Sequence, residues 1–317
     1  MSYRPAIQSI INAIETVIVG KEDVIAKSLT ALLAGGHVLL EDVPGVGKTM
    51  LVRTFSRAID LDFKRVQFTP DMLPSDLTGI SMYNQKTKEF EYRPGPLMGN
   101  IVLADEINRT SPKTQSALLE AMAERSVTVD GEVKILPSPF FVMATQNPIE
   151  HEGTYPLPEA QLDRFLLKIE MGYPSFNEEI SLLTRFEKAE PLEALQSVIT
   201  KHEVEQMQRD VRDVHVSSAV KQYIVRLIHE SRNDPNTYLG GSPRATLALM
   251  KAAQAWAYIH NRDFVLPDDV KALAGSVLGH RILLTAEARY KGKTAEQLVK
   301  GWLDSLPVPM DREVKEV

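Results

Sequence analysis

Short, wholly apolar runs alternate with helix-periodic stretches through the first half of the chain. Residues 38–40, 101–104 and 140–144 form continuous apolar runs, which are typical of parallel strands buried on both faces. Apolar residues recur at helical spacing after the first of these runs, from residue 50 onward. The pattern predicts an α/β domain that is built on a parallel sheet and extends over residues 1–173.

Beyond the Gly-Tyr-Pro sequence at 172–174, the pattern changes to helices alone. Ser242 and Thr294 are typical N-cap residues, and Gln297 completes a capping box with Thr294. The apolar stripes of these helices are most simply explained as core-facing. A smaller, all-helical C-terminal lid domain is therefore predicted over residues 174–317.

Two insertions are predicted within the α/β domain, at about residues 80–95 and 126–136. The second alternates around Asp130 and Gly131, which is the strongest short signal for a β-hairpin. The first has two apolar-rich segments separated by polar residues, so a protruding loop or another hairpin is expected there. The alternative for both is an ordinary surface segment that has no role in function. Each insertion is nevertheless joined by a short connection to the motifs described below. A movement of the insertion could therefore act on a partner molecule.

Composition narrows the class of protein. The 317 residues exceed what one hydrophobic core usually serves, and an apolar content of 44% suffices for two domains. Cysteine is absent, which excludes disulfides and thiolate chemistry, and the seven histidines lack metal-ligand spacing. No apolar stretch approaches the roughly 20 residues that span a bilayer. We therefore expect a cytoplasmic protein with no structural zinc and no membrane insertion.

The charge balance is slightly acidic. Lys and Arg total 36 against 42 Asp and Glu, giving a net charge of -6. A broad face for binding nucleic acid is disfavoured by this balance, although local basic loops remain compatible with it. No stable nucleic-acid partner is expected.

Residues 41–49 have the composition of a phosphate-binding loop between a strand and a helix. Gly45 and Gly47 allow the backbone to approach phosphate oxygens, and the helix N-terminus offers N–H donors with a positive dipole end. The Lys48 ammonium can offset charge on the outer two phosphates, and the Thr49 hydroxyl can ligate a bridging Mg²⁺. ATP or GTP with Mg²⁺ is the expected ligand. The residues expected to bind it are Pro44, Gly45, Val46, Gly47, Lys48, Thr49 and Met50.

The strict signature of this loop has a further glycine where this chain has Asp42. An acidic side chain that pointed at a triphosphate would repel it. We therefore expect Asp42 to turn away, through an Asx-turn or a left-handed backbone. Nucleotide binding should then survive the Asp42→Gly substitution.

Acidic and amide side chains follow the second and third apolar runs. Asp105 and Glu106 follow the second run directly. Neighbouring strand residues point to opposite sides, so the two carboxylates can take different roles. Asp105 is expected to hold Mg²⁺ through water, and Glu106 is expected to polarise the attacking water. Ser111 already provides the N-cap of the next helix, so these carboxylates are not needed as caps. Asn147 follows the third run and could orient the attacking water. Its assignment depends on the two preceding motifs.

These motifs occur in the order found in AAA+ ATPases, and the resemblance covers roughly residues 19–255. Four stretches resemble the MoxR family in particular, at residues 41–49, 68–79, 105–109 and 144–148. The resemblance implies that the nucleotide is ATP and that Val19 and Gly20 lie beside its adenine ring.

The same resemblance assigns two arginines. It implies that Arg164, in the sequence Leu-Asp-Arg-Phe, is the arginine finger that reaches a neighbouring subunit's nucleotide, and that Arg244 is the second sensor, touching the outer phosphate. Without the family match, an ion pair of Arg164 with Asp163 or Glu159 would be the ordinary interpretation. A cation in the first turn of a helix is unfavourable, which favours an anion near Arg244. Whether Arg244 acts within its own subunit stays open, and Arg109 is assigned no role.

By this resemblance, the chain is a Mg-dependent ATPase in a homo-oligomeric ring, expected to be a hexamer, that remodels or matures a partner protein. The implied partner contains a von Willebrand factor A domain. A magnesium-chelatase-type motor subunit is one alternative, which chelatase activity with a tetrapyrrole would distinguish. Another is a nucleic-acid motor resembling minichromosome maintenance proteins, but these have basic residues at the hairpin tip, unlike residues 130–132 here. A nucleotide-gated scaffold that hardly hydrolyses ATP is the third.

Overall fold

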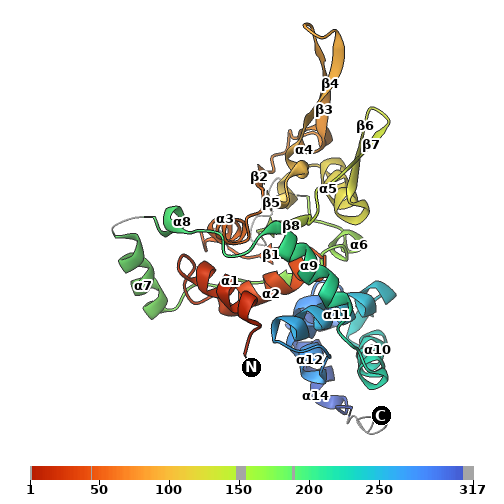
Figure 1. The fold of residues 1–317 in the computed structure, drawn as a ribbon. Helices are drawn as coiled ribbons and strands as arrows, with labels where there is room; N and C mark the ends of the chain where they lie inside the picture. The colour runs from red at the N-terminus through yellow and green to blue at the C-terminus, as the bar shows by residue number, and fades with distance from the viewer. Residues whose placement is uncertain (1, 44, 148–154, 188–189, 310–317) are drawn as a thin grey trace.

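The computed structural model describes residues 2–43, 45–147, 155–187 and 190–309. Its centre is a five-stranded sheet in the order β2-β5-β8-β1-β9, and every neighbouring pair is parallel (Figure 1). The strands are β1 (Val38–Glu41), β2 (Phe63–Gln67), β5 (Ile101–Asp105), β8 (Phe141–Gln146) and β9 (Leu167–Ile169). All three strands predicted from apolar runs are present, and β5, β8 and β1 are direct neighbours.

Alternate residues of the central strands enter two different cores. Val38 and Leu40 of β1 belong to one apolar cluster, whereas Leu39 belongs to the other. Because successive side chains of a strand point to opposite faces, a strand that is buried on both faces needs an unbroken apolar run. The sheet therefore lies between two helical layers.

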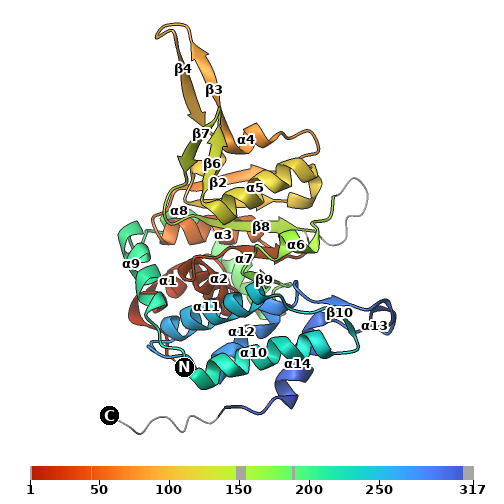
Figure 2. The same ribbon diagram turned by 90° about the vertical axis from the view of Figure 1, so that its right-hand side faces the viewer.

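The two layers differ in size. Helices α4 and α5 cover one face of the sheet, while α1, α2, α3 and the C-terminal helices cover the other (Figure 2). These helices are α1 (Pro5–Glu15), α2 (Glu22–Leu33), α3 (Lys48–Ala58), α4 (Pro74–Thr78) and α5 (Pro112–Glu124). Three shorter helical segments lie between other elements of the domain: η1 (Pro96–Met98) before β5, η2 (Ile107–Arg109) after β5 and α6 (Glu159–Leu162) after β8. The Ser111 side chain accepts from the Thr114 N–H and caps α5, as the sequence predicted.

Two antiparallel hairpins project from the α/β domain, away from the C-terminal helices (Figure 2). One pairs β3 (Gly79–Asn84) with β4 (Glu89–Pro94), and the other pairs β6 (Ser126–Val129) with β7 (Glu132–Ile135). Asp130 and Gly131 both have positive φ, 51° and 80°, as a two-residue turn with the twist of a hairpin requires. Strands β3 and β6 contact each other, so the hairpins lie side by side.

A helical lid follows, as predicted. Its helices are α9 (Lys201–Arg212), α10 (Ser218–Asn233), α11 (Pro243–Ile259), α12 (Pro267–Leu278), α13 (Ala286–Tyr290) and α14 (Ala295–Ser305). The lid also contains a short antiparallel pairing of β10 (Thr237–Leu239) with β11 (Leu283–Leu284), which helical periodicity did not predict. Helix α11 packs on α2, and α12 contacts β9. No helix in the described part of the chain is long and apolar enough to cross a membrane.

Helices α7 (Phe176–Phe186) and α8 (Pro191–Ala194) connect the two parts and lie along the α/β domain. Arg185 of α7 donates to the Glu15 carbonyl at the end of α1. Arg57 of α3 donates from Nε to the Leu195 carbonyl at 2.7 Å. The boundary at residues 173–174 stays a prediction, but α7 and α8 make these contacts with the first domain.

Candidate functional site

The carboxyl ends of β1, β5 and β8 open into a cavity of about 400 Å³. Because these strands are parallel neighbours, the segments that follow them meet at one edge of the sheet. The cavity is lined by Gly45, Gly47, Lys48, Thr49, Met50, Arg53, Asp105, Glu106, Thr145 and Asn147. Most residues predicted from the three motifs are thus brought together. Pro44 and residues 148–154 lie outside the described residues.

The loop between β1 and α3 leaves an open helix N-terminus in this cavity. Gly45 and Gly47 have φ of 86° and 90°, and a Cβ built on either would meet nothing within 4 Å. Gly47 is the N-cap of α3, and no side-chain hydrogen bond caps it among the described residues. The first N–H groups of the helix are therefore available to an anion.

Lys48 Nζ donates to the Asp42 carbonyl at 2.7 Å. Burial lowers the pKa of Lys48, while the nearby carboxylates of Asp42, Asp105 and Glu106 oppose that shift. A bound phosphate would add negative charge beside the ammonium and so favour its protonated form. The cavity thus combines a half-buried cation with the N–H donors of a helix N-terminus.

The Asp42 carboxylate points away from this loop, as predicted. Its Oδ2 accepts from the backbone N–H groups of Met171 and Gly172, at 2.6 and 2.8 Å, and its Oδ1 accepts from the N–H of Val43 at 3.0 Å. The Asx-turn and the left-handed backbone that we considered are both wrong, because the carboxylate binds the segment after β9 and Asp42 has no positive φ. Asp42 therefore joins the loop to the segment after β9.

Asp105 and Glu106 both line the cavity, although alternation along a strand predicted opposite directions. Strand β5 ends at Asp105, and Glu106 has a left-handed backbone with φ of 56°, so the alternation stops between them. Thr145 holds the pair, because its hydroxyl donates to Asp105 Oδ1 at 2.7 Å and accepts from the Glu106 N–H at 2.8 Å. This contact fixes the Asp105 carboxylate and the Glu106 backbone relative to β8.

Neighbouring polar side chains form hydrogen bonds and ion pairs with the two carboxylates. Arg65 of β2 lies 2.8 Å from Asp105 Oδ2, and Gln67 donates to Glu106 Oε2 at 2.7 Å. Arg109 Nε lies 3.2 Å from the same Glu106 oxygen. Sequence reasoning missed Arg65, Gln67 and Thr145, and gave Arg109 no role. Strand β2 has the sequence Phe-Lys-Arg-Val-Gln and carries no motif, so no local signal could have found its two residues.

The donor set fits Mg²⁺. The Thr49 hydroxyl and the Asp105 carboxylate both line the cavity and are hard oxygen donors. No group of three or more His, Cys, Asp or Glu that could hold a metal occurs among the described residues. Mg²⁺ usually takes one or two carboxylates and completes its coordination with water and substrate phosphates, so this sparse set suffices. Asn147 is 5% exposed and lines the same cavity.

An apolar pocket of about 170 Å³ adjoins the cavity and shares Gly47 and Met50 with it. It is lined by Val17, Ile18, Val19, Lys21, Val46, Gly47, Met50, Met171, Pro174, Leu182 and Phe186. Gly20 is not among these residues. Its φ is 68°, a left-handed backbone that favours glycine, and a Cβ built there would displace the flexible Glu178 side chain, whose Oε1 lies 1.6 Å away.

Helix α7 supplies one wall of this apolar pocket, which sequence reasoning missed. Leu182 and Phe186 lie four positions apart and so on one helix face. That spacing was visible in the sequence, but α7 was assigned to the lid. A flat apolar group next to a phosphate site, such as a nucleobase, suits this pocket.

A second, basic cavity of about 360 Å³ lies at the opposite edge of the sheet. Residues 35–37, before β1, and residues 163–166, before β9, contribute to it, so it lies at the amino ends of these strands. Its charged residues are Arg125, Asp163, Arg164, Arg244, Lys251 and Arg281. The structure thus brings Arg164 and Arg244 together but does not bring them to Lys48.

The ordinary interpretation of Arg164 as an ion-pair partner of Asp163 is wrong. Asp163 Oδ1 pairs with Arg281 Nε at 2.7 Å, while Arg164 Nη1 donates to the Leu119 carbonyl at 2.7 Å. Arg244 is exposed in the first turn of α11, and its charge lies near that of Arg281. A cavity with five cations and one carboxylate favours an anion.

Comparisons with known proteins identify the family of the chain. A family model described as "ATPase family associated with various cellular activities (AAA)" matches residues 37–167, and an AAA lid domain model matches residues 229–301. The protein YeaC of Bacillus subtilis, described as uncharacterized, is 59% identical over 97% of this chain and 96% of its own length. "Chaperone MoxR1" of Mycobacterium tuberculosis is 42% identical over 96% of this chain and 82% of its own length.

A solved structure extends the likeness to the whole fold. The crystal structure of a presumed ATPase from Cytophaga hutchinsonii superposes with a TM-score of 0.91 at 40% sequence identity, covering 97% of this chain and 96% of that one. "Protein MoxR" of Paracoccus denitrificans is 32% identical over 94% of each chain. With its phosphate loop, carboxylate pair and lid, this chain belongs to the MoxR family of AAA+ ATPases.

Proposed function

We propose that the chain hydrolyses Mg-ATP at the contacts between subunits of a homo-oligomeric ring, expected to be a hexamer, and uses the cycle to remodel a partner protein. One observation supports the ring most directly: the two cavities occupy opposite edges of one parallel sheet. Strand β1 alone, with four residues, separates them by roughly 13 Å.

This separation supports a role for both arginines across a contact between subunits. A nucleotide held by Lys48 and Thr49 lies at the carboxyl edge, whereas Arg164 and Arg244 lie at the amino edge. Neither arginine can reach the nucleotide of its own subunit in this arrangement. Both can therefore serve only a nucleotide that a neighbouring copy presents to the basic cavity. Hydrolysis then requires assembly.

Each residue at the carboxyl edge has a proposed task. Lys48 and the first N–H groups of α3 bind the outer phosphates, and the apolar pocket takes the adenine ring. Glu106 accepts a proton from the attacking water, and Asn147 orients that water. Thr49 and Asp105 would hold Mg²⁺, which supplies positive charge to the phosphates when bound. Arg164 and Arg244 of the neighbouring copy would oppose the charge that accumulates during transfer.

Hydrolysis per subunit will rise with protein concentration, because active sites form only where two copies meet. Phosphate release measured over a dilution series, with mass photometry of the same samples, checks this expectation. EDTA in excess over Mg²⁺ will stop hydrolysis, and excess Mg²⁺ will restore it. A rate per subunit that stays constant while the particles remain monomers would contradict the interface site.

Remodelling is supported by the two hairpins. Phe90 of β4 is 74% exposed, and its ring packs edge-on against Tyr83 of β3, with the ring centroids 5.4 Å apart. Ile135 of β7 is also exposed. The second hairpin follows α5, which begins soon after Glu106, so a change at the carboxylate pair has a short covalent route to it. Apolar side chains that project into solvent favour a protein partner, and we take a von Willebrand factor A domain as that partner.

Replacement of both Tyr83 and Phe90 by Ser will reduce capture of a von Willebrand factor A domain protein by the ATP-loaded chain. Basal hydrolysis will stay within about twofold, because the hairpin tip lies outside the nucleotide cavity. Pull-down and phosphate release on the same preparations provide the measurement. Tyr290→Ser is the matched control, since Tyr290 of the lid is 94% exposed. Equal capture by all three proteins would exclude the hairpin as the docking element.

A further inference from the structure

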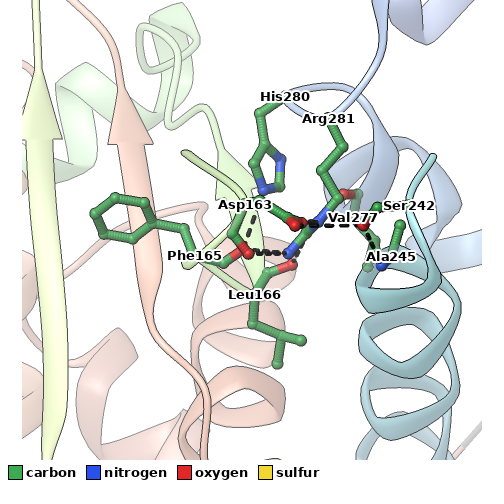
Figure 3. Close-up of polar contacts among 8 residues, drawn as sticks. All are labelled: Asp163, Phe165, Leu166, Ser242, Ala245, Val277, His280 and Arg281. Carbon is green, nitrogen blue, oxygen red and sulfur yellow. Dashed lines mark hydrogen bonds and ion pairs between the residues drawn. The ribbon is translucent and has the colours of Figure 1, made fainter. Parts of the chain in front are cut away.

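Asp163 forms an ion pair that joins the lid to the segment carrying Arg164 (Figure 3). Arg281, just after α12, approaches Asp163 Oδ1 with its Nε at 2.7 Å. The Arg281 side chain is almost fully buried, with 2% of its surface exposed, and the Asp163 side chain retains 20%. The pair lies inside the contact between the two domains.

The rest of the Arg281 guanidinium binds backbone on both sides of Arg164. It donates to the carbonyls of Asp163, at 3.2 Å, of Phe165, and of Leu166, at 3.1 Å (Figure 3). The Arg164 carbonyl is not among these acceptors, and the Arg164 side chain extends to the Leu119 carbonyl. The backbone that carries Arg164 is thus fixed at residues immediately before and after it.

The other oxygen of Asp163 contacts the start of α11. Ser242 Oγ lies 3.3 Å from Asp163 Oδ2 and also accepts from the Ala245 N–H as the N-cap of this helix. Arg244 is two residues beyond Ser242, in the first turn of α11. The Asp163 carboxylate, in the segment that carries Arg164, therefore also contacts the start of the helix that carries Arg244.

Burying a guanidinium is unfavourable unless its charge is paired and its N–H groups are bonded. Here the Asp163 carboxylate and the surrounding carbonyls meet both needs. A planar guanidinium bonded along several directions has a defined orientation, unlike an exposed ion pair. Loss of the carboxylate charge would leave Arg281 without its counter-charge and weaken the contact with Ser242.

We infer that Asp163 is a positioning residue, which holds Arg164 and Arg244 as one unit against the nucleotide of a neighbouring copy. This inference rests on the proposed function, in which both arginines act across the contact between subunits. Small displacements matter for such groups, since a misplacement of about 1 Å can slow a reaction by about 10²-fold.

Asp163→Asn preserves the size of the side chain and removes its charge. The kcat of the assembled protein will fall by about 10²-fold, while the affinity of each subunit for Mg-ATP, measured by titration calorimetry, will not change. The reason is that the residues lining the nucleotide cavity do not include Asp163. Mixing Asp163→Asn with Lys48→Ala subunits will restore hydrolysis, because some contacts then pair an intact nucleotide cavity with intact arginines.

Asp269→Asn is the matched control. Asp269 is buried in the lid and binds Arg262, with Nη1 and Oδ2 2.7 Å apart, in a second buried ion pair. Its loss will lower the melting temperature and leave kcat unchanged. If Asp163→Asn does not give folded protein, the same measurements are made on Arg281→Lys. A lysine keeps the positive charge but cannot donate hydrogen bonds to all the carbonyls that Arg281 contacts.

Three results would overturn the positioning role: an unchanged kcat, a matching loss of Mg-ATP affinity, or no recovery in the mixed assembly. A different variant, Arg164→Ala, tests the proposed function separately from the positioning role. If Arg164→Ala leaves hydrolysis intact, the arginines do not act across subunits. If Arg164→Ala slows hydrolysis and Asp163→Asn does not, only the positioning role is wrong.

Discussion

Arg164→Ala subunits will bind Mg-ATP as tightly as the unaltered chain and hydrolyse it about 10³- to 10⁵-fold more slowly. Binding survives because the nucleotide cavity and the basic cavity share no lining residue. Hydrolysis fails because a guanidinium supplied from a neighbour opposes the negative charge that spreads over the transferring phosphoryl group. Equilibrium titration with Mg-ATP and steady-state phosphate release measure the two effects separately.

A mixing experiment separates a role across subunits from a role within one. Arg164→Ala subunits retain a nucleotide cavity, and Lys48→Ala subunits retain the arginines, so a mixed assembly contains complete sites. Activity in the mixture above that of either variant alone is expected. Arg289→Ala on α13 is the control for removing an exposed lid arginine. Failure of the two variants to complement each other would place Arg164 outside the neighbour's site.

Glu106→Gln will slow hydrolysis by about 10²- to 10⁴-fold and keep nucleotide affinity. Glutamine has the shape of glutamate and can still accept from Gln67, so the cavity retains its form. It cannot take a proton from water at neutral pH, so the ATP-loaded assembly will accumulate. Phosphate release in single-turnover experiments, with mass photometry of the loaded particles, provides the test.

Lys48→Ala is the contrasting variant for this prediction. It removes the half-buried ammonium beside the phosphate loop, so it will weaken Mg-ATP binding before it affects any later step. The two substitutions should therefore separate affinity from turnover. If both variants lost affinity to the same extent, Glu106 would have a binding role and the assignment of a base would be wrong.

Local pattern was sufficient for the central strands and the chemistry that follows them. Strands β1, β5 and β8 are buried on both faces, so their apolar runs are unbroken, and the phosphate loop, Asp105 and Asn147 follow their ends directly. The hairpin at Asp130 and Gly131 was equally readable, because its turn depends on two adjacent residues. Such signals are complete within about ten residues of sequence.

The residues that surround the Asp105 and Glu106 carboxylates could not be predicted from local sequence patterns. Arg65 and Gln67 lie about 40 positions before Asp105 and Glu106, on an edge strand that has no continuous apolar run. Helix α7 has an ordinary amphipathic sequence, and nothing in it distinguishes packing on the lid from lining the apolar pocket. Contacts of this kind are set by which elements pack together.

The sequence by itself determined the family and indicated the residues for which we propose roles in nucleotide chemistry, because each motif combines glycine, lysine or carboxylate with a strand end. Only the tertiary structure decided which edge of the sheet each charged group occupies. Parallel strands place Lys48 and Glu106 after their carboxyl ends and Arg164 before the amino end of β9, and the packing of the lid places Arg244 beside Arg164. The Asp163 to Arg281 pair spans 118 positions, so no local pattern records it.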